Sequence, residues 1–515
     1  MKHPLAVLLA WLIISHAAVT GARATQAVQA PTYWPTRAWR TSTPEAQGMD
    51  SQLLADAVGF IMEQDCRLHS MLVIRNGYIV ADAYFYPFAP GLVHDLASAT
   101  KSFTSTLIGI AIDKGHIKSV DQPALDFFPD RAVANLDDRK RAITLESLLT
   151  MTSGLDCSPE RGEITLSQMR ASPDWVQFML DLPMSAQPGT RYVYCSGGVH
   201  LLSAIIRKAT GMSALAFGQQ HLFRPLGISD VGWPFDPQGA DNHGWGDMRL
   251  TPHDMARLGY LYLNGGLWEG RQLLSRKWIT AATSRHVSSG TNGYGYLWWI
   301  RPSGSYRAAG RGGQQIVVLP GQNMVVVLTG GGGYPFERLL TSFIIPAAKS
   351  TSPLPANPKA VALLESSIRR AALPRAEERK PAPALPEMAK KVSGRTYILN
   401  TNPFGLLAVS LAFGEHDQAM LRLYLSELAT GETSRDLKLT VGLDNVFRKS
   451  PGRFGLPAAA KGFWEAENVF VVDLDEIGNI NHWRVTMTFE DERALVVMHD
   501  ETGLGEVELV GRVKK

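Results

Sequence analysis

The chain has 515 residues, a length that predicts two or three domains. Hydrophobic residues make up 45% of it and charged residues 19%, which is an ordinary globular composition with enough apolar surface for a large core. The formal net charge of +3 is too small to indicate a nucleic-acid-binding protein.

The first 24 residues have the pattern of a signal peptide. Lys2 and His3 give a short basic start, an apolar run extends from Pro4 to Ile14, and Ala22 and Ala24 offer the small side chains that a signal peptidase requires. The alternative, a membrane anchor, needs a longer run to cross about 30 Å of hydrocarbon. We therefore expect export to the periplasm or the medium, with no integral membrane span.

Residues 25–350 have the pattern of one α/β (α+β) domain. Ser70–Tyr84 predicts a β-hairpin around the turn Asn76-Gly77, and apolar residues at helical spacing predict a helix from Phe103 to Gly115. Apolar strands are expected again near the end of this region, at Ile316–Leu319 and Met324–Leu328. The pattern predicts an antiparallel sheet that distant parts of the chain complete and that helices cover, with a helical insert from about Asp126 to Trp299.

The chain changes character after residue 350. Residues 351–392 are rich in Pro and Ala and predict a linker with one helical patch near Lys359–Ala372. From residue 393 to the end, short strands alternate with turn residues, which predicts a small all-β barrel or sandwich. The expected strands are Arg395–Leu399, Leu406–Ala412, Met420–Tyr424, Leu437–Val441, Val469–Val472, His482–Thr488 and Ala494–Met498.

A serine and a lysine three residues apart form the first candidate catalytic pair. Ser98 and Lys101 fall at the expected start of a helix, so one turn places both side chains on the same face. The serine is then close to the positive end of the helix, where its backbone N–H can bind an oxyanion. No other lysine of the chain has a serine three residues before it. Taken alone, the pair also fits an exposed lysine behind a capping serine.

Tyr194 and Ser196 form the second candidate element. They follow Pro188-Gly189-Thr190 and precede a glycine pair and a helical pattern, so we expect them on a loop. A phenol at this place can relay protons between a nucleophile, a lysine and a leaving group. The spacing alone is weak evidence, because Tyr262 and Tyr424 have similar neighbours.

The ordered set of motifs resembles the class C β-lactamase-related serine hydrolases of the penicillin-recognising superfamily, near the branch of nylon-oligomer hydrolases and β-lactamase-like esterases. The resemblance covers roughly residues 39–349. Its segments are SATKSFTSTLIG, LESLLTMTSGL, RYVYCSGGVHLLSAI, LTPHDMARLGYLYLNGGLWEGRQLLS, YGYLWW and AAGRGGQQIVVLPGQNMVVVLTGG.

The resemblance implies a role for each matching residue. Ser98 would be acylated, Lys101 would act as general base, and Tyr194 would complete the proton relay. Ser196 stands where many relatives have asparagine and would help to bind the substrate or contact the lysine. The family's third element is a strand with a basic residue followed by Thr or Ser and Gly, and this chain has Ala308 there instead.

The strand that carries Ala308 is nevertheless expected to line the site. Gly310, Arg311 and Gly312 follow it and are the candidates for binding the substrate and the oxyanion, with the Arg311 N–H as the second donor. The Arg311 side chain either turns inward to a substrate carboxylate or points to solvent. The missing basic residue argues against β-lactam or D-Ala-D-Ala specificity.

These residues predict a hydrolase of small-molecule esters or amides that acts through an acyl-enzyme. Two alternatives stay open, namely a β-lactamase or D-Ala-D-Ala-type peptidase and a non-catalytic receptor on the same fold. No metal or other cofactor is expected, because the sequence lacks metal-ligand spacing. Of the three cysteines, Cys66, Cys157 and Cys195, we expect Cys195 to remain unpaired because it lies inside a candidate motif. Every candidate residue precedes Gly313, so the C-terminal region is expected to be dispensable for the chemistry.

Overall fold

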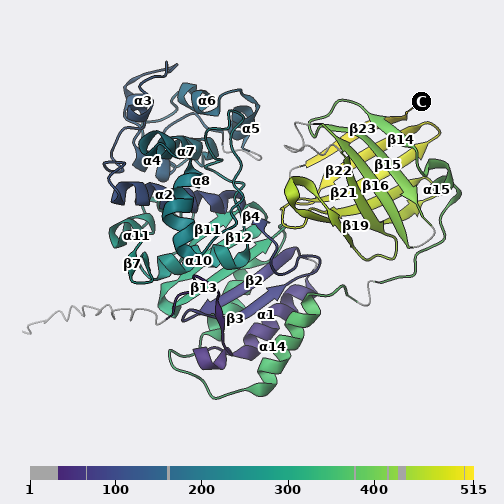
Figure 1. Cartoon of the computed structure of the whole chain (residues 1–515), viewed down its shortest axis with the longest axis horizontal. Helices are drawn as coiled ribbons and strands as arrows, with labels where there is room; N and C mark the ends of the chain where they lie inside the picture. Colours follow the sequence, from purple (N-terminus) through teal and green to yellow (C-terminus); the bar gives the residue numbers. More distant parts are fainter. Residues whose placement is uncertain are drawn as a thin grey trace, which may run out of the picture.

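The computed structural model describes residues 33–64, 66–158, 163–375, 379–414, 417–426, 436–503 and 505–514. The predicted signal peptide, residues 1–24, lies outside these residues. In the described part of the chain, no helix combines the length and apolar character needed to cross a bilayer. An N-terminal domain of sheet and helices is followed by a C-terminal barrel (Figure 1).

A nine-stranded sheet forms the centre of the N-terminal domain. Its order is β1-β3-β2-β13-β12-β11-β10-β9-β8, and its strand pairs are antiparallel apart from β1 with β3. Strands β2 and β13 come from opposite ends of the domain and are neighbours, as the sequence predicted. The strands are β1 (Arg40–Thr41), β2 (Leu68–Arg75), β3 (Tyr78–Tyr84), β8 (Val287–Ser289), β9 (Asn292–Tyr294), β10 (Trp299–Ile300), β11 (Tyr306–Gly310), β12 (Gln314–Leu319) and β13 (Met324–Gly330).

Both faces of this sheet are buried. Successive side chains of a strand point to opposite faces, so Val73 belongs to the core beneath α1 and α14, whereas Leu72 belongs to the core shared with α2, α7 and α10. This double burial explains why the central strands consist of continuous apolar residues. The helices are α1 (Ser51–Glu63), α2 (Thr100–Asp113), α3 (Asp138–Arg141), α4 (Leu145–Leu149), α5 (Ile164–Ala171), α6 (Trp175–Asp181), α7 (Ser196–Thr210), α8 (Ala214–Gly218), α9 (Arg224–Leu226), α10 (Pro252–Leu263), α11 (Arg276–Ala282), α12 (Phe336–Arg338) and α13 (Ile345–Ala347).

The first half of the expected linker is part of this domain. Helix α14 (Pro358–Ala371) packs against α1, with Leu364 and Ala371 buried in their shared core. Asn357 caps its first turn by accepting the N–H of Ala360. The connection between the domains therefore begins after α14, and α15 (Glu387–Val392) already packs on the barrel.

The C-terminal domain is a closed barrel of nine strands. Strand β17 pairs with β16 on one side and with β19 on the other, which closes the sheet, and β18 adds to β19 outside the closure. Closure leaves no long unpaired edge. The strands are β14 (Thr396–Leu399), β15 (Leu406–Phe413), β16 (Gln418–Leu425), β17 (Asp436–Gly442), β18 (Arg448–Pro451), β19 (Pro457–Ala466), β20 (Val469–Asp475), β21 (His482–Glu490), β22 (Arg493–Asp500) and β23 (Gly505–Val513).

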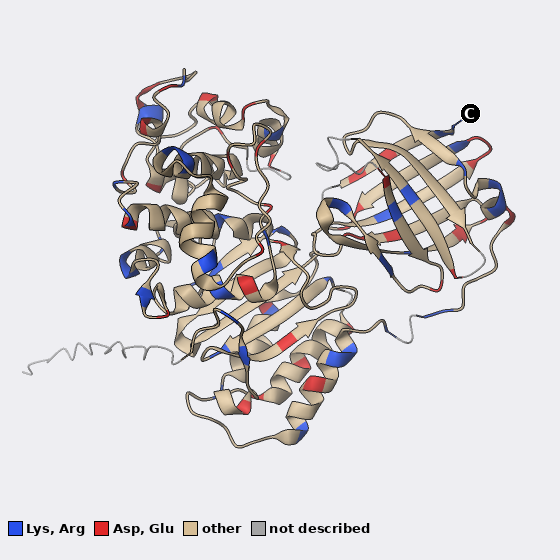
Figure 2. Cartoon of the chain, in the orientation of Figure 1, with Lys and Arg blue, Asp and Glu red and all other residues tan. Residues whose placement is uncertain are grey.

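Charged residues of both signs are interspersed over the two domains in the view of Figure 2. This distribution agrees with the small net charge of the chain. The fold as a whole is the predicted mixed α+β domain followed by an all-β barrel.

Candidate active site

Ser98 and Lys101 lie together at the start of α2. Ser98 belongs to the short 3-10 helix η2 (Ala97–Ala99) that precedes α2, and Lys101 lies on the first turn of α2. Lys101 Nζ donates to Ser98 Oγ at 2.8 Å and to the backbone carbonyl of Trp245 at 2.9 Å. Only 1% of Lys101 is exposed. Burial lowers the pKa of Lys101 to about 8, although the charges of Glu163 and Asp247 raise it in part.

The backbone before Ser98 has an unusual conformation. Ala97 has a φ of 43°, in the left-handed region that residues with a side chain rarely adopt. The Asp95 carboxyl accepts the Ala97 N–H at 2.7 Å. Backbone strain of this kind is concentrated at functional sites, where the surrounding structure maintains it.

Tyr194 and Ser196 lie beside this pair. Tyr194 lies on the loop two residues before α7 begins, and its ring centroid is 4.9 Å from Lys101 Nζ. Burial raises the pKa of Tyr194, and the nearby charge of Glu163 raises it further, against a smaller opposite effect of Ser98 and Ser196. The phenol therefore stays protonated at neutral pH and is able to donate to a leaving group.

A carboxylate that the sequence analysis did not identify completes this group. Glu163 accepts the Ser196 N–H at 3.1 Å and the Ser196 hydroxyl at 2.9 Å. It lies at the N-terminus of α7, where the helix dipole favours a negative charge. Glu163 belongs to no sequence motif and is separated from Ser196 by 33 residues, so sequence spacing gave no signal for it.

The expectation that Cys195 remains unpaired is wrong. Cys195 forms a disulfide with Cys157, and Cys66 is the third cysteine. A place inside a motif does not keep a cysteine from pairing when the fold brings a second cysteine within reach, and here the two Cα atoms are 5.7 Å apart. The bond fixes the loop of Tyr194 and Ser196 to the segment that leads toward Glu163.

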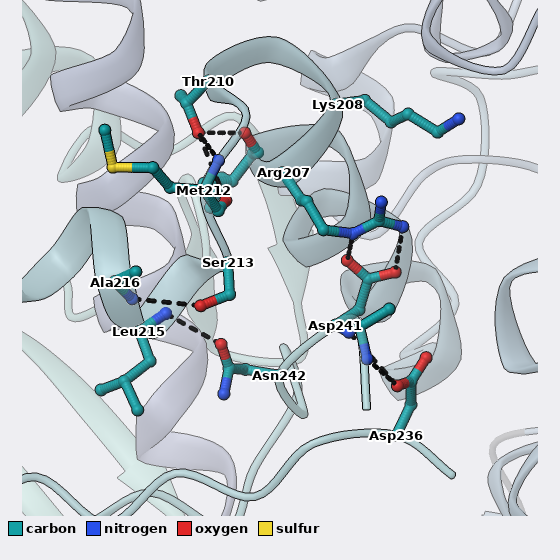
Figure 3. A network of polar contacts seen from close by, with 12 residues as sticks. Arg207, Lys208, Thr210, Met212, Ser213, Leu215, Ala216, Asp236, Asp241 and Asn242 are labelled. Atoms are coloured by element: carbon teal, nitrogen blue, oxygen red, sulfur yellow. Dashed lines mark hydrogen bonds and ion pairs between the residues drawn. The ribbon is translucent and has the colours of Figure 1, made fainter. Parts of the chain in front are cut away.

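A polar network fixes the loop that supplies the Trp245 carbonyl. Arg207, near the end of α7, forms a bidentate ion pair with Asp241 at 2.6 and 2.9 Å (Figure 3). Asn242 accepts the Leu215 N–H at 2.8 Å and donates to the Trp233 carbonyl at 2.9 Å. Because Asp241 is almost fully buried, these bonds hold the loop in one position relative to α7 and, through Trp245, relative to Lys101.

The end of β11 approaches Ser98 closely. A side chain at Gly310 would collide with the Leu96 carbonyl oxygen and would lie 3.1 Å from the Ser98 nitrogen, so only glycine fits there. Arg311 and Gly312 follow in the 3-10 helix η5 (Arg311–Gly313), where Gly312 has a φ of 77°. The predicted strand residues are thus brought to the nucleophile.

Of the two directions considered from the sequence, the Arg311 side chain takes the one toward solvent: the residue is exposed, and its guanidinium also contacts the barrel. Its guanidinium donates to Asn481 Oδ1 at 3.0 Å and to Thr502 Oγ1 at 2.9 Å, both in the barrel. Ala308 is fully buried and carries no charge. The Arg311 guanidinium, directly after this strand, is therefore bound by barrel residues.

The β-lactamase family model matches residues 46–344, which is more than half of the chain. The chain belongs to this family. Its similarity to 6-aminohexanoate-dimer hydrolase of Paenarthrobacter ureafaciens is 24% identity over 288 residues, covering 52% of this chain and 73% of the relative. Penicillin-binding protein 4 of Amycolatopsis lactamdurans is 26% identical over 287 residues, covering 47% and 72%.

Structural similarity supports the same fold. A Bacillus anthracis protein provisionally assigned as a 6-aminohexanoate-dimer hydrolase superposes with a TM-score of 0.53 at 19% identity, covering 63% of this chain and 90% of that one.

A further similarity is in sequence. Lovastatin esterase of Penicillium rubens is 30% identical over 189 residues, covering 33% of this chain and 46% of that one. The β-lactamase-family domain is thus related to amidases, esterases and penicillin-binding proteins.

The groups near Ser98 define the chemistry that the site can support. Among the residues that the structure describes, no group of three or more His, Cys, Asp or Glu side chains is arranged to hold a metal ion. The groups near Ser98 that can take part in a reaction are the Lys101 amine, whose pKa is lowered, the Tyr194 phenol and backbone N–H groups. Together they are suited to acyl transfer.

Proposed function

We propose that the protein is a serine hydrolase that cleaves small-molecule esters or amides through an acyl-enzyme on Ser98. The observation that carries the proposal is the 2.8 Å contact between Lys101 Nζ and Ser98 Oγ in a buried site. Burial lowers the pKa of Lys101 to about 8, so a useful fraction of the amine is neutral and able to accept a proton near neutral pH.

In the proposed acylation, neutral Lys101 takes the Ser98 hydroxyl proton while Oγ bonds to the substrate carbonyl carbon. The backbone N–H groups of Ser98 and Arg311 stabilise the oxyanion that forms. The carbonyl then re-forms as the bond to the leaving oxygen or nitrogen breaks, and Tyr194 donates a proton to that atom and recovers one from the Lys101 ammonium. Water attacks the acyl-enzyme in the same way, which releases a carboxylic acid and restores the Ser98 hydroxyl.

The charge of the site favours esters and amides without a required carboxylate. Ala308 offers no charge, and the Arg311 guanidinium is bound to the barrel. The names of the 6-aminohexanoate-dimer hydrolase and lovastatin esterase relatives agree with amide and ester substrates. A β-lactamase or D-Ala-D-Ala-type peptidase is the second candidate, favoured by the penicillin-binding relative.

We further propose that the protein is exported. The sequence begins with a signal-peptide pattern, and a disulfide adjoins the site. Disulfides form and persist mainly in oxidising compartments, which include the periplasm and the extracellular medium.

A substrate panel tests the proposed function. The purified protein would be assayed with p-nitrophenyl esters of increasing acyl length, with p-nitroanilides and with nitrocefin, beside Ser98→Ala. Ser105→Ala is the control, because Ser105 is a serine of α2, the helix that directly follows Ser98, and it is buried away from the site. We expect ester turnover that Ser98→Ala abolishes and Ser105→Ala retains. If Ser98→Ala keeps native turnover, or if the native protein turns over no compound of the panel, the proposal is wrong.

A further inference from the structure

The turn between β20 and β21 of the barrel extends into the β-lactamase-family domain. The barrel lies beside the end of the sheet where β4 (His94–Asp95) and β12 are labelled (Figure 1). In the turn, residues 476–481, Ile477 and Ile480 are 1% and 2% exposed. Ile477 packs with Tyr84 and Phe88 of the N-terminal domain. Two buried isoleucines at the tip of a turn indicate a fixed contact between the domains.

One side of this turn contacts the segment before Ser98. The Asp95 N–H donates to the Gly478 carbonyl at 2.7 Å. Gly478 has a φ of 79°, and a Cβ atom there would lie 2.5 Å from the Val93 carbonyl oxygen. The close approach therefore requires glycine. The Asp95 carboxyl in turn accepts a hydrogen bond from the N–H of Ala97, the residue directly before Ser98.

The other side of the turn contacts the residues after β11. Ile480 packs against Gly312 closely enough to collide with any side chain at that position. Asn481 Oδ1 accepts from the Arg311 guanidinium at 3.0 Å. Thr502, the second acceptor of Arg311, is itself held by the Asp500 carboxylate at 2.7 Å. The turn thus contacts both backbone segments whose N–H groups are proposed to bind the oxyanion.

We propose that the barrel turn 476–481 is a positioning element of the active site, which fixes the distance between the Ser98 and Arg311 N–H groups. The inference rests on the proposed acyl-transfer function. It also changes the expectation from sequence that the barrel is dispensable, because barrel residues bind the Asp95 N–H and the Arg311 guanidinium. Gly478 and Asn481 act through these groups and do not touch the substrate.

The experiment compares two glycine variants of the full chain. Gly478→Ala places a methyl group against the Val93 carbonyl and should displace the turn. Gly394→Ala is the matched control, because Gly394 is also in the barrel domain and has the same φ of 79°, yet a Cβ there meets no atom within 4 Å. Both variants carry the same backbone strain, so only the contact with the N-terminal domain differs.

For a p-nitrophenyl ester we expect Gly478→Ala to lower kcat by about tenfold or more with little change in KM. A misplaced oxyanion donor stabilises the transition state less but leaves the binding of the substrate unchanged. Gly394→Ala should keep the native kcat. Asn481→Ala should lower kcat by a smaller factor, and Asn481→Asp, which keeps an acceptor for Arg311, should restore it. Circular dichroism and unfolding curves establish that each variant is folded.

Three results separate the possible failures. Native kcat in both Gly478→Ala and Asn481→Ala overturns the inference. So does an equal loss in Gly478→Ala and Gly394→Ala, because the effect would then come from general strain in the barrel. If the native chain shows no Ser98-dependent turnover of any ester, the proposed function itself fails.

Discussion

The pH dependence of ester hydrolysis should follow the neutral form of Lys101. Burial lowers the pKa of this amine to about 8. With that pKa, about one tenth of Lys101 is neutral at pH 7 and about nine tenths at pH 9. The kcat/KM of a neutral ester should therefore rise about tenfold between these two values and level off above pH 9. An exposed lysine, with a pKa near 10.4, would give a rise that continues beyond pH 10.

The assay is the initial rate of p-nitrophenyl ester hydrolysis from pH 6 to 10, corrected for spontaneous hydrolysis and accompanied by a check of folding at each pH. Glu163→Gln supplies an internal test. The negative charge of Glu163 raises the pKa of Lys101, so its removal should shift the rise to lower pH. Glu365→Gln, on the exposed side of α14, should leave the profile unchanged. A rate that is independent of pH between 6.5 and 9 would refute the assignment of Lys101 as base.

Three further variants or probes give independent outcomes. Lys101→Arg should retain less than about a tenth of native turnover although the charge is kept, because arginine does not release its proton in proteins; substantial turnover would exclude Lys101 as base. Nitrocefin should be hydrolysed about ten- to a hundredfold less efficiently than short esters, since Ala308 removes a charge-assisted partner for its carboxylate; comparable kcat/KM values for the two substrates would contradict this. Cys157→Ser should lower the free energy of unfolding by about 3–4 kcal/mol, because the disulfide with Cys195 closes a loop across a sequence separation of 38 residues; an unchanged denaturant midpoint would show that the bond does not stabilise the fold.

Local sequence signals predicted much of the N-terminal domain. The hairpin around Asn76-Gly77 is β2 and β3, and the apolar runs after residue 315 are β12 and β13. These elements are continuous apolar segments between turn residues, so local composition sufficed. The proximity of Ser98 and Lys101 likewise follows from one helical turn.

The barrel strands were predicted less completely. Strand β18, Arg448–Pro451, was missed because it is short and has no apolar residue except Pro. Strand β19 was missed because its first residues, Pro457–Ala460, are Pro and three Ala, which have low β propensity, and β23 because it begins with Gly505 and contains Gly511. The segments of β19 and β23 become strands through pairing with neighbours that themselves have strong strand patterns.

Contacts between distant segments explain the remaining differences at the site. Glu163 reaches Ser196 through tertiary structure, and the Arg311 side chain is directed by Asn481, which is 170 residues away. Cys195 pairs with Cys157 across a loop. None of these contacts has a local sequence signal, since each depends on how separate elements pack.

The most direct test of a catalytic Ser98 is covalent labelling. The native protein would be incubated with a fluorophosphonate, measured by intact-mass spectrometry and digested to locate the modified residue. We expect one adduct per chain on the peptide that contains Ser98, and none in Ser98→Ala. An adduct that persists in Ser98→Ala, or one that maps to another residue, would contradict the central claim.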